Sequence, residues 1–299
     1  ISSLFLLLLL PALALARIDI EVSGRYENSH EPNMRIQYSG SEIGVISDVE
    51  RDNFKLGDSN LKTMVESYFG KRPTDAYLRS PTPWGDLYQS YGWDQILRSL
   101  APVNGRILSI TSEPMIIMRQ IFENNSSKPA IFNVGISQSV ANTVVSKWYG
   151  NVEMTSGQEI NYEWEMEPFK VGDKTSFSYT SSYGKDTKKA ITVTVGSESE
   201  MDLLLQPNQS VIAELQATKA TVRLEMAYEV RLDGQVAVNY DKKYKGHHFW
   251  ALDVKGVMSS AGLPNRVRSS EVVEVGFYTN AQIIVRDQES GVKMMEAAI

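Results

Sequence analysis

An unbroken alternation of apolar and polar side chains is the feature that most strongly limits how this chain can fold. Between Thr221 and Leu232 every second residue is apolar, in the order Val222, Leu224, Met226, Tyr228, Val230 and Leu232. A period of two predicts a β-strand with one buried face. About twelve residues is roughly twice the length of an ordinary strand. Asp233-Gly234 follows, a dipeptide typical of a two-residue hairpin, so residues 235–240 are expected to return beside this strand.

The chain divides into two regions with different sequence patterns. From about residue 105 to 287 strand patterns predominate, and long strands predict an elongated, mainly β protein with a small α+β N-terminal region. Residues 17 to about 120 are mixed. Helical spacing predicts a helix that Asp58 or Ser59 caps and Gly70 ends, with apolar positions at Leu61, Met64, Val65, Tyr68 and Phe69. A proline-rich loop comes next, and a second helix is expected from about residue 94 to 100.

Composition excludes several classes of site. The chain has no cysteine and only three histidines, which rules out disulfides, thiolate zinc sites and iron–sulfur clusters. Its formal net charge of −6 argues against a nucleic-acid partner. Its 42% of hydrophobic residues is enough for a real core.

The first sixteen residues form an apolar run that ends in Ala14-Leu15-Ala16. The run is too short to span a bilayer and ends like a signal-peptidase site, so residues 1–16 are expected to be a signal peptide of a secreted protein. Three sequons agree with export, and they place candidate glycans on Asn124, Asn125 and Asn208. Asn124 and Asn125 are too close for both to be modified.

One motif resembles the nucleophile region of an enzyme but lacks the acidic partner that the chemistry requires. Gly57-Asp58-Ser59 matches the nucleophile region of GDS-type esterases, but Tyr244 and Lys245 stand where an acid should precede the late histidines. No phosphate-binding loop, dinucleotide fingerprint or metalloprotease motif occurs either. The sequence therefore predicts no enzyme, no catalytic residue, no cofactor and no metal site.

A second alternation runs from Glu159 to Glu167. Its apolar face carries Ile160, Tyr162, Trp164 and Met166, and its polar face carries Glu163, Glu165 and Glu167. Two interpretations fit this pattern. It is typical of a half-buried strand in an ordinary sheet, and also of a membrane-barrel strand with a lipid face and a lumen face.

Aromatic residues gather between positions 68 and 93. Trp84, Tyr88, Tyr91 and Trp93 form the densest part of this group. Such a cluster is either part of the core or an exposed platform that recognises a membrane lipid or a glycan.

Several segments together carry a family resemblance. They are FENNSSKPAIFNVGISQSVANTVVSKWY at 122–149, SFSYTSSYGKDTKKAITVTV at 176–195 and LLLQPNQSVIAELQATKATVRLEMAYEV at 203–230. SEPMIIMRQIFENNSSKPAIFNVGISQSV and EVGFYTNAQIIVRD add to it. The chain resembles the aerolysin-like β-pore-forming proteins over about residues 55–287. It is similar to the epsilon-toxin and mosquitocidal-toxin branch, and most of all to eukaryotic spherulin-2A-like members, including insect follicular or yolk-associated proteins.

The resemblance implies an elongated protein divided into a recognition region at 17–120, a β body at 121–287 and a removable tail at 288–299. It implies that an amphipathic hairpin at about 151–174 is stored on the body and joins those of other copies in a transmembrane barrel. The partners implied are the protein itself and a membrane lipid or glycan receptor. Glutamates and Pro168 depart from the usual hairpin composition. An alternative is therefore a non-lytic secreted storage, structural or ligand-carrying protein with the same fold.

Overall fold

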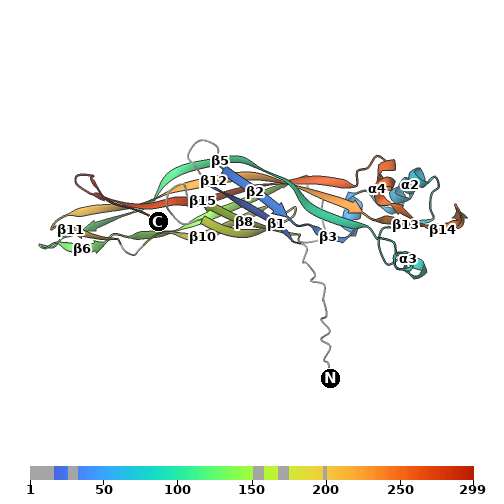
Figure 1. The fold of residues 1–299 in the computed structure, drawn as a ribbon, viewed down its shortest axis with the longest axis horizontal. Helices are drawn as coiled ribbons and strands as arrows, with labels where there is room; N and C mark the ends of the chain where they lie inside the picture. The colour runs from blue at the N-terminus through green and yellow to red at the C-terminus, as the bar shows by residue number, and fades with distance from the viewer. Residues whose placement is uncertain (1–16, 26–32, 151–157, 168–174, 198–200) are drawn as a thin grey trace, which may run out of the picture.

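The computed structural model describes residues 17–25, 33–150, 158–167, 175–197 and 201–299. These residues build a long rod with a helical head at one end and a small two-stranded tip at the other (Figure 1). The expected signal peptide at 1–16 lies outside the described residues. So do residues 151–157 and 168–174 of the segment in which a hairpin is expected.

A seven-stranded sheet forms the body of the rod, in the order β10-β7-β15-β12-β5-β3 with β16 paired to β15. Its long strands are β5 (Leu97–Glu123), β12 (Ser210–Asp233) and β15 (Arg266–Asp287). Its shorter strands are β3 (Glu42–Val45), β7 (Ile136–Tyr149), β10 (Thr187–Ser197) and β16 (Lys293–Ala298). The predicted strand at 221–232 is confirmed, but β12 has 24 residues, about twice the predicted length.

A second sheet lies along the body, in the order β2-β1-β8-β9. Its strands are β1 (Ile18–Arg25), β2 (Asn33–Ser39), β8 (Glu159–Glu167) and β9 (Thr175–Ser182). β1 pairs with β2 and β9 pairs with β8 in antiparallel fashion, whereas β1 and β8 run parallel. The main core includes the inner faces of both sheets, with side chains such as Ile20, Trp164, Val222 and Phe277.

The head combines residues from distant parts of the sequence. Its helices are α1 (Asp48–Asn53), α2 (Asp58–Phe69), α3 (Pro83–Tyr91) and α4 (Val254–Ser260). Its three-stranded sheet has the order β14-β13-β4, from β4 (Asp75–Tyr77), β13 (Gln235–Tyr244) and β14 (His247–Asp253). The head thus draws on residues on both sides of position 120.

The tip pairs β6 (Ala130–Asn133) with β11 (Asp202–Leu205). A second, separate core beneath it includes Val134, Leu205, Leu215 and Ile283. β16 lies within the expected tail at 288–299 and pairs with residues 282–286 of β15.

The helix predicted at 58–69 is confirmed as α2, and Gly70 ends it in the left-handed region with φ 94°. The capping prediction is wrong. Gly57 is the N-cap and no side chain caps the helix. Asp58 instead forms an ion pair with Lys62 one turn later, with 3.0 Å between Oδ2 and Nζ.

The helix predicted at 94–100 is wrong. From Leu97 the chain is already in β5, where it lies between residues of β12 and β3. Two strand partners outweigh a weak local helical pattern. The helix of this region is α3, which begins at Pro83, inside the loop expected from the prolines.

The Asp233-Gly234 hairpin prediction is also wrong, because β5 and β15 already occupy both edges of β12. β13 therefore continues into the head, where it pairs with β14 and β4. Gly234 has φ 117°, and a Cβ atom there would lie 2.4 Å from the carbonyl oxygen of Gln95. Glycine is required by this close approach, at the point where the chain passes from body to head.

A buried ion-pair group joins the head to the body. Arg98 of β5 lies between Glu42 of β3 and Glu50 of α1, and its Nε is 3.1 Å from Glu50 Oε1. Arg98 and Glu50 are 5% and 1% exposed. Burial lowers the pKa of the Arg98 guanidinium. Three separate elements are thus held together by charges that water does not screen.

Candidate functional site

β8 and β9 form an antiparallel hairpin whose apolar face is covered by the body. Ile160, Tyr162, Trp164 and Met166 are all buried, at no more than 1% exposed. The rings of Tyr162 and Tyr179 stack 4.8 Å apart, and those of Trp164 and Phe177 stack 5.8 Å apart, each pair across the two strands. The partner strand of 159–167 is therefore 175–182, further along the chain than the segment at 151–174 singled out in the sequence.

The opposite face of the hairpin is polar. Glu163 and Glu165 are exposed, and the side chain of Glu167 lies outside the described residues. Glu163 lies opposite Glu21 of β1 on one side and Ser178 of β9 on the other. A shallow hollow of about 460 Å³ lies over this face, and the exposed residues that line it include Glu21, Glu163, Glu165 and Ser178. Two carboxylates at directly opposed positions repel each other, which weakens the contact between β1 and β8.

The hairpin is an insertion between two strands that pair with each other. Residues 143–146 of β7 lie opposite residues 187–190 of β10. The chain leaves the body sheet after β7, forms β8 and β9 in the second sheet, and returns as β10 beside the strand it left. Removing the hairpin from its present position would therefore leave the pairing of β7 with β10 intact.

A second candidate site is an aromatic surface on the head, formed by Tyr77, Trp84, Tyr91, Trp93 and Phe249. The ring centroids of Tyr77 and Trp84 are 6.2 Å apart, those of Trp84 and Phe249 5.2 Å, and those of Phe249 and Tyr91 6.2 Å. Tyr91 stacks on Trp93 at 4.7 Å with 17° between the planes. Trp84 and Tyr91 are 49% and 54% exposed, and Trp93 is half-buried.

Tyr88 lies beneath this surface rather than on it. It is 4% exposed, and its hydroxyl donates to the carbonyl oxygen of Tyr77 at 2.8 Å, with the carbonyl oxygen of Gln235 at 3.0 Å. Burial raises the pKa of this hydroxyl above its ordinary value. Tyr88 thus ties α3 to β4 and β13 and supports the exposed rings.

The backbone that presents Trp84 adopts an unusual conformation. Trp84 and Asp86 have φ 63° and 62°, in the left-handed region that bulky side chains avoid. Local bonds hold this turn. Ser90 Oγ donates to the carbonyl oxygen of Gly85 at 2.9 Å, and Leu87 N–H donates to Thr82 Oγ1 at 2.8 Å. Strain retained at an exposed tryptophan is typical of a functional position.

Sequence reasoning missed Phe249, and it did not include Tyr77, a member of the aromatic cluster at 68–93, among the predicted recognition residues. Phe249 comes from β14, more than 150 residues after Trp84, and bridges two rings of α3. Local patterns carry no signal for this approach, because it depends on β13 pairing with both β4 and β14.

The three candidate glycan acceptors have different surroundings. Asn124 is 2% exposed, and its Nδ2 donates to the carbonyl oxygens of Lys128 and Leu205, each at 2.9 Å. Asn125 is exposed, and Asn208 is exposed in a turn with φ 60°. A glycan can extend into solvent from Asn125 and Asn208, whereas Nδ2 of Asn124 is occupied by the fold.

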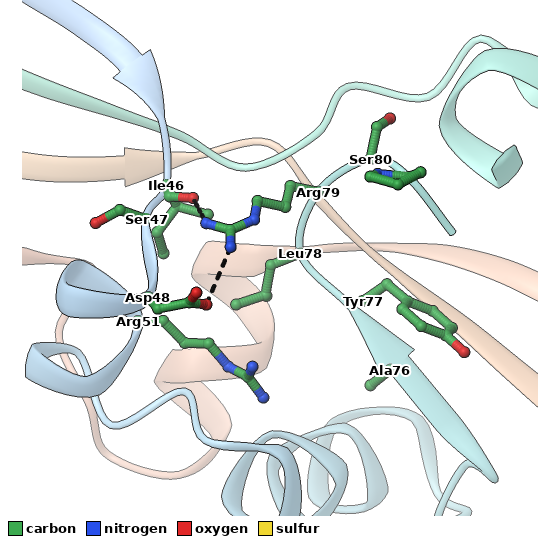
Figure 2. A pocket seen from close by; sticks show the side chains of 10 residues that line it. Ile46, Ser47, Asp48, Arg51, Ala76, Tyr77, Leu78, Arg79 and Ser80 are labelled. Carbon is green, nitrogen blue, oxygen red and sulfur yellow. Dashed lines mark hydrogen bonds and ion pairs between the residues drawn. The ribbon is translucent and has the colours of Figure 1, made fainter. Parts of the chain in front are cut away.

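A hollow of about 290 Å³ lies beside α1 and β4, and Figure 2 shows its lining. Arg79 reaches across it to the carbonyl oxygen of Ile46 and to Asp48, with 3.0 Å between Nη2 and Oδ1 (Figure 2). Arg51 donates through Nε to the carbonyl oxygen of Leu56 at 2.9 Å. Both arginines hold neighbouring loops, so we assign this hollow a structural role.

Within the described ranges, no cluster of three or more histidine, aspartate or glutamate side chains could hold a metal ion. Among the same residues, the helices are too short and too polar for any of them to cross a bilayer.

Among the solved structures that are similar to this chain, parasporin-2 matches most of its length. Parasporin-2 is a Bacillus thuringiensis toxin that recognises cancer cells, and its structure matches with a TM-score of 0.56 and 17% identity. The match covers 87% of this chain and 100% of parasporin-2. It confirms the mainly β, elongated aerolysin-like architecture expected from the sequence.

No protein-family model matches the chain. Two curated relatives come from species of the genus Megalopyge. The chain is 34% identical to U-megalopygitoxin(8)-Mc8 of Megalopyge crispata over 258 residues, which cover 86% of this chain and 88% of the relative. It is 34% identical to U-megalopygitoxin(8)-Mo12 of Megalopyge opercularis over 253 residues, covering 85% and 87%. With this identity over most of both lengths, the chain belongs to the U-megalopygitoxin(8) family and is a toxin-like protein of aerolysin-like fold.

Proposed function

We propose that this protein is a secreted, non-enzymatic pore-forming toxin that docks through the aromatic surface of its head, assembles with copies of itself and inserts the β8–β9 hairpin into a membrane. The observation that carries the proposal is the position of the hairpin. An amphipathic pair of strands interrupts two neighbours, β7 and β10, that already pair with each other.

The dimensions of the hairpin agree with a membrane strand. β8 has nine residues and β9 has eight. A tilted strand of about 9–11 residues crosses the hydrocarbon of a bilayer, so β8 falls within this range and β9 is one residue short of it. On insertion, the apolar side chains of β8 leave their contacts with the body and face lipid instead; they are Ile160, Tyr162, Trp164 and Met166.

Assembly follows from the chemistry of strand edges. A lone hairpin in lipid leaves backbone N–H and C=O groups without partners, so hairpins from several copies must close into a barrel. Glu163, Glu165 and Glu167 then line the lumen, and a lumen with rings of carboxylates favours cations.

The aromatic surface supplies the attachment. Exposed Trp and Tyr rings fit the interfacial region of a membrane and also stack on the faces of sugar rings. Trp84 and Tyr91 are the rings with the most open area, and Trp93 backs Tyr91.

The direct test is release of a trapped dye from liposomes by protein that starts at Arg17, with and without trypsin. We expect release together with ring-shaped oligomers on the membrane. Absence of both under every condition would overturn pore formation and favour the non-lytic storage or carrier role.

Attachment is tested separately by cosedimentation with glycan-free vesicles and by binding to a glycan array. We expect Trp84→Ala and Tyr91→Ala to lose binding in one of these two assays. Tyr149→Ala is the matched control, because Tyr149 is 51% exposed and lies on the body. Equal binding by all three folded variants would reject the aromatic surface as the attachment site.

A further inference from the structure

A carboxyl group lies buried where the hairpin contacts the body. Glu271 of β15 is 0% exposed. Its Oε2 accepts a hydrogen bond from the hydroxyl of Tyr162 on β8 at 2.5 Å, and its Oε1 accepts one from the hydroxyl of Ser181 on β9 at 2.7 Å. One acidic side chain of the body is therefore bonded to both strands of the hairpin.

A second body strand completes the group. The hydroxyl of Tyr228 on β12 lies 3.0 Å from that of Tyr162 and 3.3 Å from Glu271 Oε2. Beside it, the hydroxyls of Tyr183 and Ser269 are 2.9 Å apart. The contacts of Tyr162 and Ser181 with Glu271 lie in the buried core and exist only while the hairpin is docked, whereas the contact of Tyr228 with Glu271 joins two body strands.

The surroundings of Glu271 offer no counter-charge. Its cross-strand neighbours are Met226 of β12 and Trp148 of β7. The titratable groups that face it are the phenols of Tyr162 on β8, Tyr179 on β9 and Tyr228 on β12. Across the part of the chain that the structure describes, Glu271 forms no ion pair. An ionised carboxylate here is stabilised by hydroxyl groups alone.

We propose that Glu271 is a proton-controlled clasp, which holds the hairpin to the body when protonated and loosens it when ionised. The clasp regulates the insertion step of the proposed function and rests on it. Tyr162 and Ser181 act through Glu271: their hydroxyl groups hold the hairpin against this carboxyl, and both bonds break when the hairpin leaves the body.

The direction of the pH effect follows from burial. Burial raises the pKa of the Glu271 carboxyl above 4.5, and hydrogen bonds from Tyr162 and Ser181 oppose this shift without cancelling it. The docked state therefore retains a proton that the released state gives up. The equilibrium constant for docking is largest below the ordinary pKa of the carboxyl. It falls as pH rises toward the docked-state pKa, by up to about tenfold per pH unit for the release of one proton. Above that pKa the effect is constant.

The test is hydrogen–deuterium exchange of the full chain, read on the amides of β8 and β9 between about pH 4 and pH 9 and corrected for the intrinsic exchange rate. We expect the protection of the native hairpin to fall as pH rises. In Glu271→Gln, which keeps the shape of a protonated acid but cannot ionise, the protection should stay constant. Glu274→Gln is the matched control, because Glu274 lies on the same strand with its side chain exposed, and it should behave like the native protein.

Tyr162→Phe provides a second measurement that holds even if Glu271→Gln fails to fold. It removes a donor to the charged form of Glu271, so it should lower protection on the order of tenfold to a hundredfold at high pH and less at low pH. The clasp is overturned by a native hairpin with no pH dependence, by an equal dependence in Glu271→Gln, or by a uniform loss in Tyr162→Phe. Hairpin exchange is measured without a membrane, so absent dye release would refute the pore and leave this result standing.

Discussion

A covalent bond between β1 and β8 should hold the hairpin in its stored position. Residues 18–25 of β1 pair in parallel with residues 160–167 of β8, and Glu21 lies opposite Glu163, both with exposed side chains. The chain has no cysteine, so Glu21→Cys with Glu163→Cys introduces a single defined pair of thiols. Insertion as proposed requires β8 to leave β1, and an oxidised pair forbids it.

The geometry and the magnitude can both be worked out. Neighbouring strands lie about 4.8 Å apart, within the range of about 4.4–6.8 Å between Cα atoms that a disulfide spans. The bond closes a loop of about 140 residues, for which chain entropy gives about 5 kcal/mol of added stability against unfolding. We expect dye release to fall to the background of empty vesicles after oxidation and to return fully after reduction.

A matched variant distinguishes attachment of the hairpin to β1 from a general stiffening of the hairpin by a disulfide. Glu163→Cys with Ser178→Cys joins β8 to β9 across their own register, and this bond travels with the hairpin. It should leave dye release close to that of the reduced protein. If the β1–β8 disulfide forms completely on a non-reducing gel and the oxidised protein still releases dye at the reduced rate, the stored strand is not the inserting one.

Three further outcomes follow from packing and exposure. Arg98→Met should lower the free energy of unfolding in urea by about 3–5 kcal/mol, because it leaves a buried Glu50 unpaired. Arg106→Met, at an exposed pair, should change it by less than about 1 kcal/mol, and equal losses would contradict the argument. Gly234→Ala should cost about 1–3 kcal/mol in the same assay, because of its positive φ and the close Gln95 oxygen, and an unchanged midpoint would refute this. In a eukaryotic secretory host, Asn125→Gln should remove the mass of one glycan on a gel and Asn124→Gln should not; the reverse pattern would show that Asn124 is accessible.

The parts of the fold that follow from local periodicity could be predicted. The alternation around Leu224 and Tyr228 describes β12 correctly because one face of the strand meets a continuous core. Leu61, Met64 and Val65 describe α2 for the same reason. In both elements, the local pattern and the tertiary environment favour the same structure.

The rest depends on partners that are distant in the sequence. Leu97 enters a strand because β12 and β3 lie beside it, and Gln235 enters the head because both edges of β12 are taken. The parallel contact of β1 with β8 joins segments about 140 residues apart, and no spacing rule predicts such a pairing. The contacts of Phe249 with Trp84 likewise depend on distant strands. The hydrogen bonds around Glu271 form only where β8, β9, β12 and β15 come together.

The insertion between β7 and β10 also limits how far the hairpin can extend from the body. Residues 150–186 separate the end of β7, which pairs with β15, from the start of β10. Straightened into two arms of about 18 residues each, at about 3.3 Å per residue, this segment would extend about 60 Å. The hydrocarbon core of a bilayer is about 30 Å thick. A body sheet anchored through its head could therefore stand about 30 Å clear of the hydrocarbon and still place a complete strand pair across it.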